Sequence, residues 1–163
     1  MKILKYILFL ILPITLLYGT ECHPLATFKK INSKELYFKE QNIKIKLKTM
    51  KTIFDNSANL EWWGTENTTP TKVISSVIVE ENKNKIVFPV SAYIDLTELW
   101  GVKVIKVSKG FKIVFIGSQT DFLYQATFLI HNNQLVERKV ISCTFPEERW
   151  EKTTYSWIQD TGQ

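Results

Sequence analysis

The sequence has few of the side chains that catalysis and metal binding need. Only two of its 163 residues are histidines and only two are cysteines. Cys22, His23, His131 and Cys143 together would make an acceptable zinc ligand set, but ligands normally come in spaced pairs, and Cys22 and His23 are direct neighbours. There is also no Gly-rich phosphate loop, calcium loop or nucleotide-binding fingerprint. We therefore expect no metal and no cofactor.

Motifs for catalysis are equally sparse. The hydroxyl-rich segment 117–121 places Ser118 near Asp121, with His131 further along, but glycine, serine and aspartate are also what ordinary β-turns use. Asp95 and Glu98 could act as paired carboxylates, yet a spacing of three is what a helix capping box requires. The sequence favours a protein that is not an enzyme, and a hydrolase is the least favoured alternative.

The chain also lacks an apolar run long enough to cross a membrane. Residues 1–5 carry two lysines, and residues 6–18 form an uncharged, mainly apolar stretch of about 13 residues, whereas a spanning helix needs roughly 20. This pattern predicts a cleaved secretory signal peptide over residues 1–19, with Gly19 and Thr20 at the processing site. Glu21 before Cys22 disfavours lipid attachment. We expect a secreted or periplasmic protein with no transmembrane anchor after cleavage.

Residues 20–163 have the size of one domain, and they are only mildly basic. The whole chain carries a charge of +5, and losing Lys2 and Lys5 with the signal leaves +3. So small an excess, with no clustered basic stripe, does not indicate a nucleic-acid partner. A single β-rich domain is the expectation for residues 20–163.

The two cysteines, Cys22 and Cys143, both belong to the mature part. An even count in an oxidising compartment predicts one disulfide, which would tie the new N-terminus to a segment near the C-terminus. Two unpaired thiols are the alternative.

Alternation of apolar and polar residues with a period of two dominates the mature chain. It predicts strands over residues 43–48, 71–79, 86–88, 102–107, 111–116, 122–131, 135–145 and 153–158, with turns at 81–84, 108–110 and 132–133. A short helical turn is expected near residues 95–100, and residues 55–70 read as the most loop-like part. The fold class is all-β and mainly antiparallel: a sandwich or an up-and-down barrel of about seven to nine strands.

Several short motifs near the C-terminus carry a resemblance. They are residues 124–128 (YQATF), 135–138 (LVER), 145–147 (FPE) and 154–155 (TY). In these the chain resembles small exported bacterial proteins of unassigned function. The resemblance covers about a quarter of the chain, implies bacterial export and carries no catalytic residue.

Two surface features are candidates for binding. Lys44, Lys46 and Lys48 alternate with apolar residues, so they share one face of a strand, which either docks an acidic protein or anionic lipid headgroups or is simply solvated. Trp62 and Trp63 point to opposite faces if they lie on a strand, so one of them is near the surface. We expect a domain that binds another macromolecule, as an inhibitor, immunity protein or envelope accessory factor does. A carrier of a small apolar ligand in a barrel or sandwich cavity is the alternative.

Overall fold

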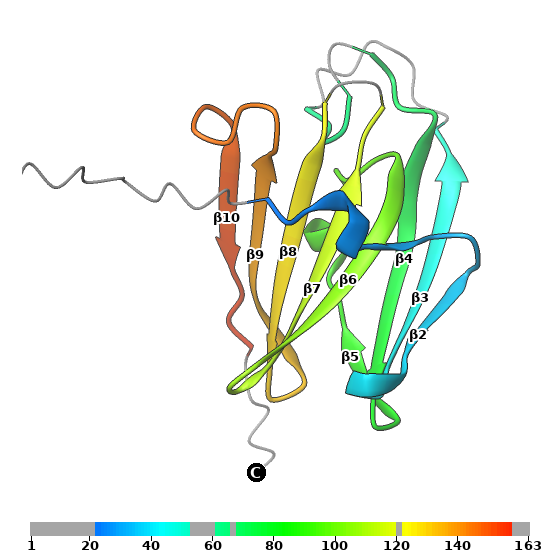
Figure 1. The fold of residues 1–163 in the computed structure, drawn as a ribbon, viewed down its shortest axis with the longest axis vertical. Helices are drawn as coiled ribbons and strands as arrows, with labels where there is room; N and C mark the ends of the chain where they lie inside the picture. Colours follow the sequence, from blue (N-terminus) through cyan, green and yellow to red (C-terminus); the bar gives the residue numbers. More distant parts are fainter. Residues whose placement is uncertain (1–21, 53–60, 66–67, 120–121, 158–163) are drawn as a thin grey trace, which may run out of the picture.

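A computed structural model describes residues 22–52, 61–65, 68–119 and 122–157 of the chain. Within them, ten strands form two mainly antiparallel sheets that face each other like a sandwich, not one closed barrel (Figure 1). The predicted signal peptide, residues 1–19, lies outside the described residues.

The larger sheet has six strands in the order β1-β6-β7-β8-β9-β10. Their bounds are β1 Lys29–Lys30, β6 Leu99–Val107, β7 Gly110–Gly117, β8 Tyr124–His131, β9 Gln134–Ser142 and β10 Trp150–Thr154. Strands β6 to β10 form an antiparallel meander, in which each strand pairs with the next one along the chain.

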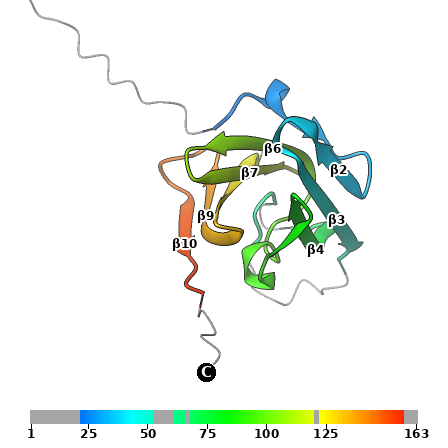
Figure 2. The same ribbon diagram turned by 90° about the horizontal axis from the view of Figure 1, so that it is seen from below.

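The smaller sheet has four strands in the order β2-β3-β4-β5. They are β2 Glu35–Phe38, β3 Ile43–Lys51, β4 Lys72–Glu81 and β5 Asn84–Val87. The short 3-10 helix η1 (Leu25–Thr27) precedes β1, and two others, η2 (Lys39–Gln41) and η3 (Val90–Ala92), connect strands. Seen end on, the sheets curve around a shared interior (Figure 2).

Each strand predicted from the period of two overlaps a strand of the structure, and the turns between them follow the expected chemistry. Asn82 and Lys83, and likewise Asn132 and Asn133, all have positive φ, as two-residue hairpin turns with the twist of their strands require. Two strands, β1 and β2, were not predicted; both are short.

The helical turn that precedes β6 is η3, which lies a few residues before the predicted position at residues 95–100. Leu96 and Thr97 instead form isolated bridges to Trp63 and Val73. The Glu98 carboxylate accepts hydrogen bonds from the backbone of Thr71 and Lys72, at 2.6 and 2.9 Å. Because Asp95 and Glu98 are engaged in tertiary contacts, they do not cap a helix.

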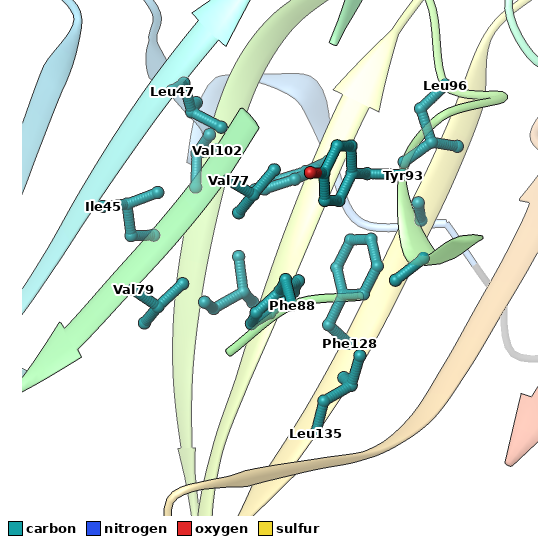
Figure 3. Packing of buried hydrophobic residues seen from close by; sticks show 14 of the residues in the cluster. Ile45, Leu47, Val77, Val79, Phe88, Tyr93, Leu96, Val102, Phe128 and Leu135 are labelled. Carbon is teal, nitrogen blue, oxygen red and sulfur yellow. The ribbon is translucent and has the colours of Figure 1, made fainter. Parts of the chain in front are cut away.

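The core lies between the sheets (Figure 3). Ile45, Leu47, Val77 and Val79 of the smaller sheet face Val102, Phe128 and Leu135 of the larger one, and Phe88, Tyr93 and Leu96 of the connecting segment lie between them. The ring of Phe128 lies 5.3 Å from that of Phe88, in the connecting segment, and 5.0 Å from that of Phe115, on the neighbouring strand of its own sheet. No helix among the described residues is long and apolar enough to span a membrane.

Candidate binding surface

Trp63 is a core residue at the loop end of the sandwich. Its backbone amide donates to the Asp95 carbonyl at 3.0 Å, and its carbonyl accepts from the amide and the hydroxyl of Thr97, at 3.1 and 2.6 Å. The side chain is only 6% exposed and packs 6.4 Å, centroid to centroid, from the ring of Tyr124. Trp62 is half-buried, so the two neighbouring tryptophans differ in exposure and Trp62 is the one nearer the surface.

Arg149 joins this tryptophan pair to the loop between β9 and β10. Its guanidinium carbon lies 4.6 Å from the centre of the Trp63 ring, within the range of a cation–π contact. Its Nη2 donates to the Trp62 carbonyl at 3.0 Å, and its backbone amide donates to the Phe145 carbonyl at 3.1 Å. Arg149 therefore fixes the loop against the buried indole of Trp63.

The disulfide between Cys22 and Cys143, predicted from the sequence, is present and holds the start of the same loop. The Cys143 amide donates to the Leu123 carbonyl at 2.8 Å, and Gln125 exchanges hydrogen bonds with both the backbone amide and the carbonyl of His23, at 2.9 and 2.8 Å. Because both cysteines are consumed in this bond, neither is a free metal ligand. Among the described residues no group of three or more metal-ligating side chains lies together.

Two large aromatic side chains, one in this loop and one just after it, face solvent. Phe145 is 49% exposed and Trp150, the first residue of β10, is 59% exposed. With Trp62 and Arg149 they form what we call the aromatic rim. The sequence reasoning singled out Trp62 and Trp63 but missed Phe145 and Trp150, because nothing in the local pattern distinguishes an exposed aromatic residue from a core one.

The lysines of the predicted binding face lie on the other sheet. Lys44 and Lys46 are ion-paired on the outer face of β3: Lys44 with Glu35 at 2.7 Å, and Lys46 with Glu80 at 3.1 Å and Glu35 at 3.8 Å. The hydrogen bond between Glu35 and Lys44 lowers the pKa of the glutamate and raises that of the lysine. Lys48 is exposed opposite Ser76. The lysine face thus lies on β3, whereas Trp62 and Trp63 belong to no strand of either sheet and Trp63 forms an isolated bridge to Leu96.

An ionic cluster around the buried Arg138 lies on the inner side of the larger sheet. The Arg138 side chain is only 4% exposed, its Nη2 lies 2.7 and 2.8 Å from the two carboxylate oxygens of Asp95, and its Nη1 is ion-paired with Glu151. This cluster connects β9, β10 and the segment before β6. It acts as a structural cross-link between them.

The serine considered as a nucleophile is far from the histidine. Ser118 follows Gly117, which pairs with the first residue of β8, whereas His131 is the last residue of that strand, seven residues further on. At about 3.3 Å per residue the two ends are roughly 23 Å apart. Asp121 lies outside the described residues.

Comparison of the chain with protein-family models, with curated proteins and with solved structures finds no match. A function therefore has to be argued from the surface itself.

Proposed function

We propose that this chain is an exported, non-enzymatic β-domain that binds another macromolecule through the aromatic rim, as an inhibitor, immunity protein or envelope accessory factor would. The observation that carries the proposal is the exposure of Phe145, on a loop that the fold holds in place, and of Trp150, at the start of the strand that follows it. Large aromatic side chains dominate binding energy at protein interfaces, together with arginine. Export is supported by the apolar N-terminal stretch and is compatible with the disulfide.

Rigidity of the rim supports the same proposal. Arg149 is held by Trp62 and Trp63, and Cys143 is held by Cys22, so the loop does not have to be ordered when a partner binds. A preorganised surface loses less conformational entropy on association. In the interior, in contrast, Phe88, Phe115 and Phe128 contact one another, and we take the surface as the binding site.

The test is capture of a partner by the exported mature protein, followed by truncation of the rim. Phe145→Ala and Trp150→Ala should each weaken the affinity for a captured partner by about 30-fold, or about 2 kcal/mol, mainly through faster dissociation. Trp62→Ala should also weaken the affinity for the captured partner. Val90→Ala is the matched control, because Val90 is 58% exposed on a different segment, and its affinity should stay within twofold of wild type.

Circular dichroism and thiol alkylation must first show that each variant is folded and oxidised. If folded Phe145→Ala and Trp150→Ala proteins bind every captured partner as tightly as wild type, the rim is not the binding surface.

Lys44, Lys46 and Lys48 remain a proposed steering surface on the opposite sheet. Changing all three to glutamine should slow association and weaken its salt dependence, while dissociation stays unchanged. Because Lys44 and Lys46 are already ion-paired, we expect most of the effect from Lys48. Association rates measured at two salt concentrations would check this.

A further inference from the structure

Strand β10 is the last strand of the larger sheet and pairs only with β9 among the described residues (Figure 1). Two hydrogen bonds show which residues of β10 direct their backbone groups toward β9. The Ser142 amide donates to the Arg149 carbonyl at 2.9 Å, and the Tyr155 amide donates to the Val136 carbonyl at 3.0 Å. Backbone groups of an antiparallel strand point alternately toward and away from the neighbour. The odd-numbered residues of β10 therefore face β9, and Trp150, Lys152 and Thr154 direct their N–H and C=O groups outward.

These three residues form an edge on which another strand can pair. Their backbone groups make no backbone hydrogen bond within the described part of the chain. Their side chains are exposed as well. An exposed edge of this kind is a ready template for adding an extended chain.

The edge is also held in place from within. Glu151 is ion-paired with the buried Arg138, and the Trp157 indole donates to the Leu135 carbonyl at 2.6 Å, just beyond the strand. Lys152 is paired with Glu137 at 2.8 Å. A partner strand would therefore meet a preorganised template.

The rows of side chains on the outer face of the sheet indicate what such a strand should carry. One row ends in two cations: it runs Lys103, Val114, Thr127, Lys139 and Lys152 across β6 to β10. The row beside it is mainly apolar and ends in Trp150, after Ile116, Gln125 and Ile141. A strand added at the edge would continue these rows with an acidic residue opposite Lys152 and an apolar residue opposite Trp150.

Several cations lie on this face. A hollow of about 230 Å³ on it is lined by Lys112, Lys139 and His23, with Glu137 as its acidic residue. Burial, and then the charges of Lys103 and Lys112, lower the pKa of His23, which is consistent with a positive potential there. A second copy of this chain, added antiparallel at the edge, would bring the same cationic face alongside, so like charges disfavour self-pairing.

We propose that the free edge of β10 receives an extended, acidic segment of the partner protein, with a carboxylate opposite Lys152 and an apolar side chain opposite Trp150. This inference rests on the proposed binding function and names the chemistry of the partner. The partner's main chain would supply hydrogen bonds to the three outward residues, and the two side-chain rows would set its register.

The probe is the peptide acetyl-TVTETVT-amide, which places Val, Glu and Val on one face of a strand. Hydrogen exchange of the oxidised mature protein should slow at least tenfold at the amides of Trp150, Lys152 and Thr154 when the peptide is saturating. The amides of Glu151 and Thr153, already directed at β9, should not change. A peptide with N-methyl groups on the Val and Glu residues cannot form this ladder and should not protect the three amides.

A charge exchange tests the side-chain row. Lys152→Glu should weaken binding of the glutamate peptide about tenfold and strengthen binding of the version with lysine in place of glutamate. Lys109→Glu, in the exposed turn before β7, is the matched control and should change neither affinity. The N-methylated peptide leaves the protein unaltered, so the test does not depend on any variant folding.

Three results would overturn the inference: no protection of the three amides, equal binding of the N-methylated peptide, or a dimer through β10 in sedimentation. These results can be distinguished from a failure of the proposed function. If a captured partner depends on Phe145 but leaves the three amides exchanging freely, binding through the rim stands and the edge assignment falls. If the peptide protects the edge but no captured partner depends on Phe145, the rim is wrong.

Discussion

Arg138 cross-links β9, β10 and the segment before β6 on the inner side of the larger sheet. It is nearly inaccessible to solvent and binds both Asp95 and Glu151. Arg138→Met should lower the free energy of unfolding by about 3 kcal/mol, because two carboxylates lose their counterion. Urea unfolding at neutral pH measures this. Lys152→Ala removes only the exposed pair with Glu137 and should cost less than about 1 kcal/mol. Equal losses for the two variants would show that burial of Arg138 is not what matters.

Tyr124 should make stability fall at high pH. Its hydroxyl is buried and donates to the Thr97 carbonyl at 2.8 Å. Burial, and then the charge of Asp95, raise its pKa well above the usual value of about 10. The folded state therefore keeps this proton where the unfolded state releases it, so stability present below pH 10 is lost as the pH rises further. Tyr124→Phe should show a smaller loss of the urea midpoint between pH 9 and 11 than wild type. Parallel curves for the two proteins would contradict this.

The candidate site was only partly predictable at the scale of single residues. Neighbouring tryptophans on an extended chain must differ in exposure, but which one is buried depends on the bridge between Trp63 and Leu96, far away in sequence. The exposure of Phe145 and Trp150 depends on how the 143–149 loop leaves the sheet. Arg138 faces inward because a register shift at Leu129/Ile130 changes the alternation along β9. None of these burials and orientations can be recognised from the neighbouring residues in the sequence.

Among the elements, a long strand such as β3 was predictable because it has one buried and one solvated face. Strand β3 alternates Ile43, Ile45 and Leu47 inward with lysines outward. Strands β1 and β2 were missed because two and four residues are too few to show a period. The helical turn was misplaced because Asp95 and Glu98, which resemble a capping pair, make their hydrogen bonds to distant segments. The alternation of apolar and polar residues thus predicted the long strands, whereas tertiary contacts decided the structure of the segments that connect them.

The hairpin of β6 and β7 should depend on Gly110. Its φ of +139° is rarely adopted by other residues, and a Cβ there would overlap the backbone carbonyl of Ile130 in the adjacent strand. Gly110→Ala should therefore lower the free energy of unfolding by about 2 to 3 kcal/mol, measured by urea unfolding. Lys109→Ala, next to it in the same exposed turn, should change it by less than about 0.5 kcal/mol. A tolerated alanine at 110 would mean that the hairpin has another way to turn.

For the whole molecule, the disulfide closes a loop of 121 residues around both sheets. In the chain-entropy model such a loop is worth about 4 to 5 kcal/mol. Replacing Cys22 and Cys143 together by serine should lower the free energy of unfolding by about that amount and the melting temperature by roughly 10 to 20 °C. Reduction of the wild-type protein should reproduce the loss. Oxidised protein should resist alkylation under denaturing, non-reducing conditions; labelling of both thiols would show that the bond is absent.

Export and oxidation should be coupled in this chain, because Cys22 lies just after the predicted cleavage site. The apolar stretch ends at Tyr18, so the exported protein should begin between Gly19 and Cys22, and its intact mass should lack the preceding residues and any acyl group. The same mature chain made in a reducing cytosol should have both thiols free and melt at the lower temperature expected of the serine variant. Oxidation in vitro should then restore the melting temperature of the exported form. A mass that retains the first eighteen residues would show that the predicted cleavage does not occur, and acylation at Cys22 would make the disulfide impossible in that form, so either result contradicts the processing on which the proposed function relies.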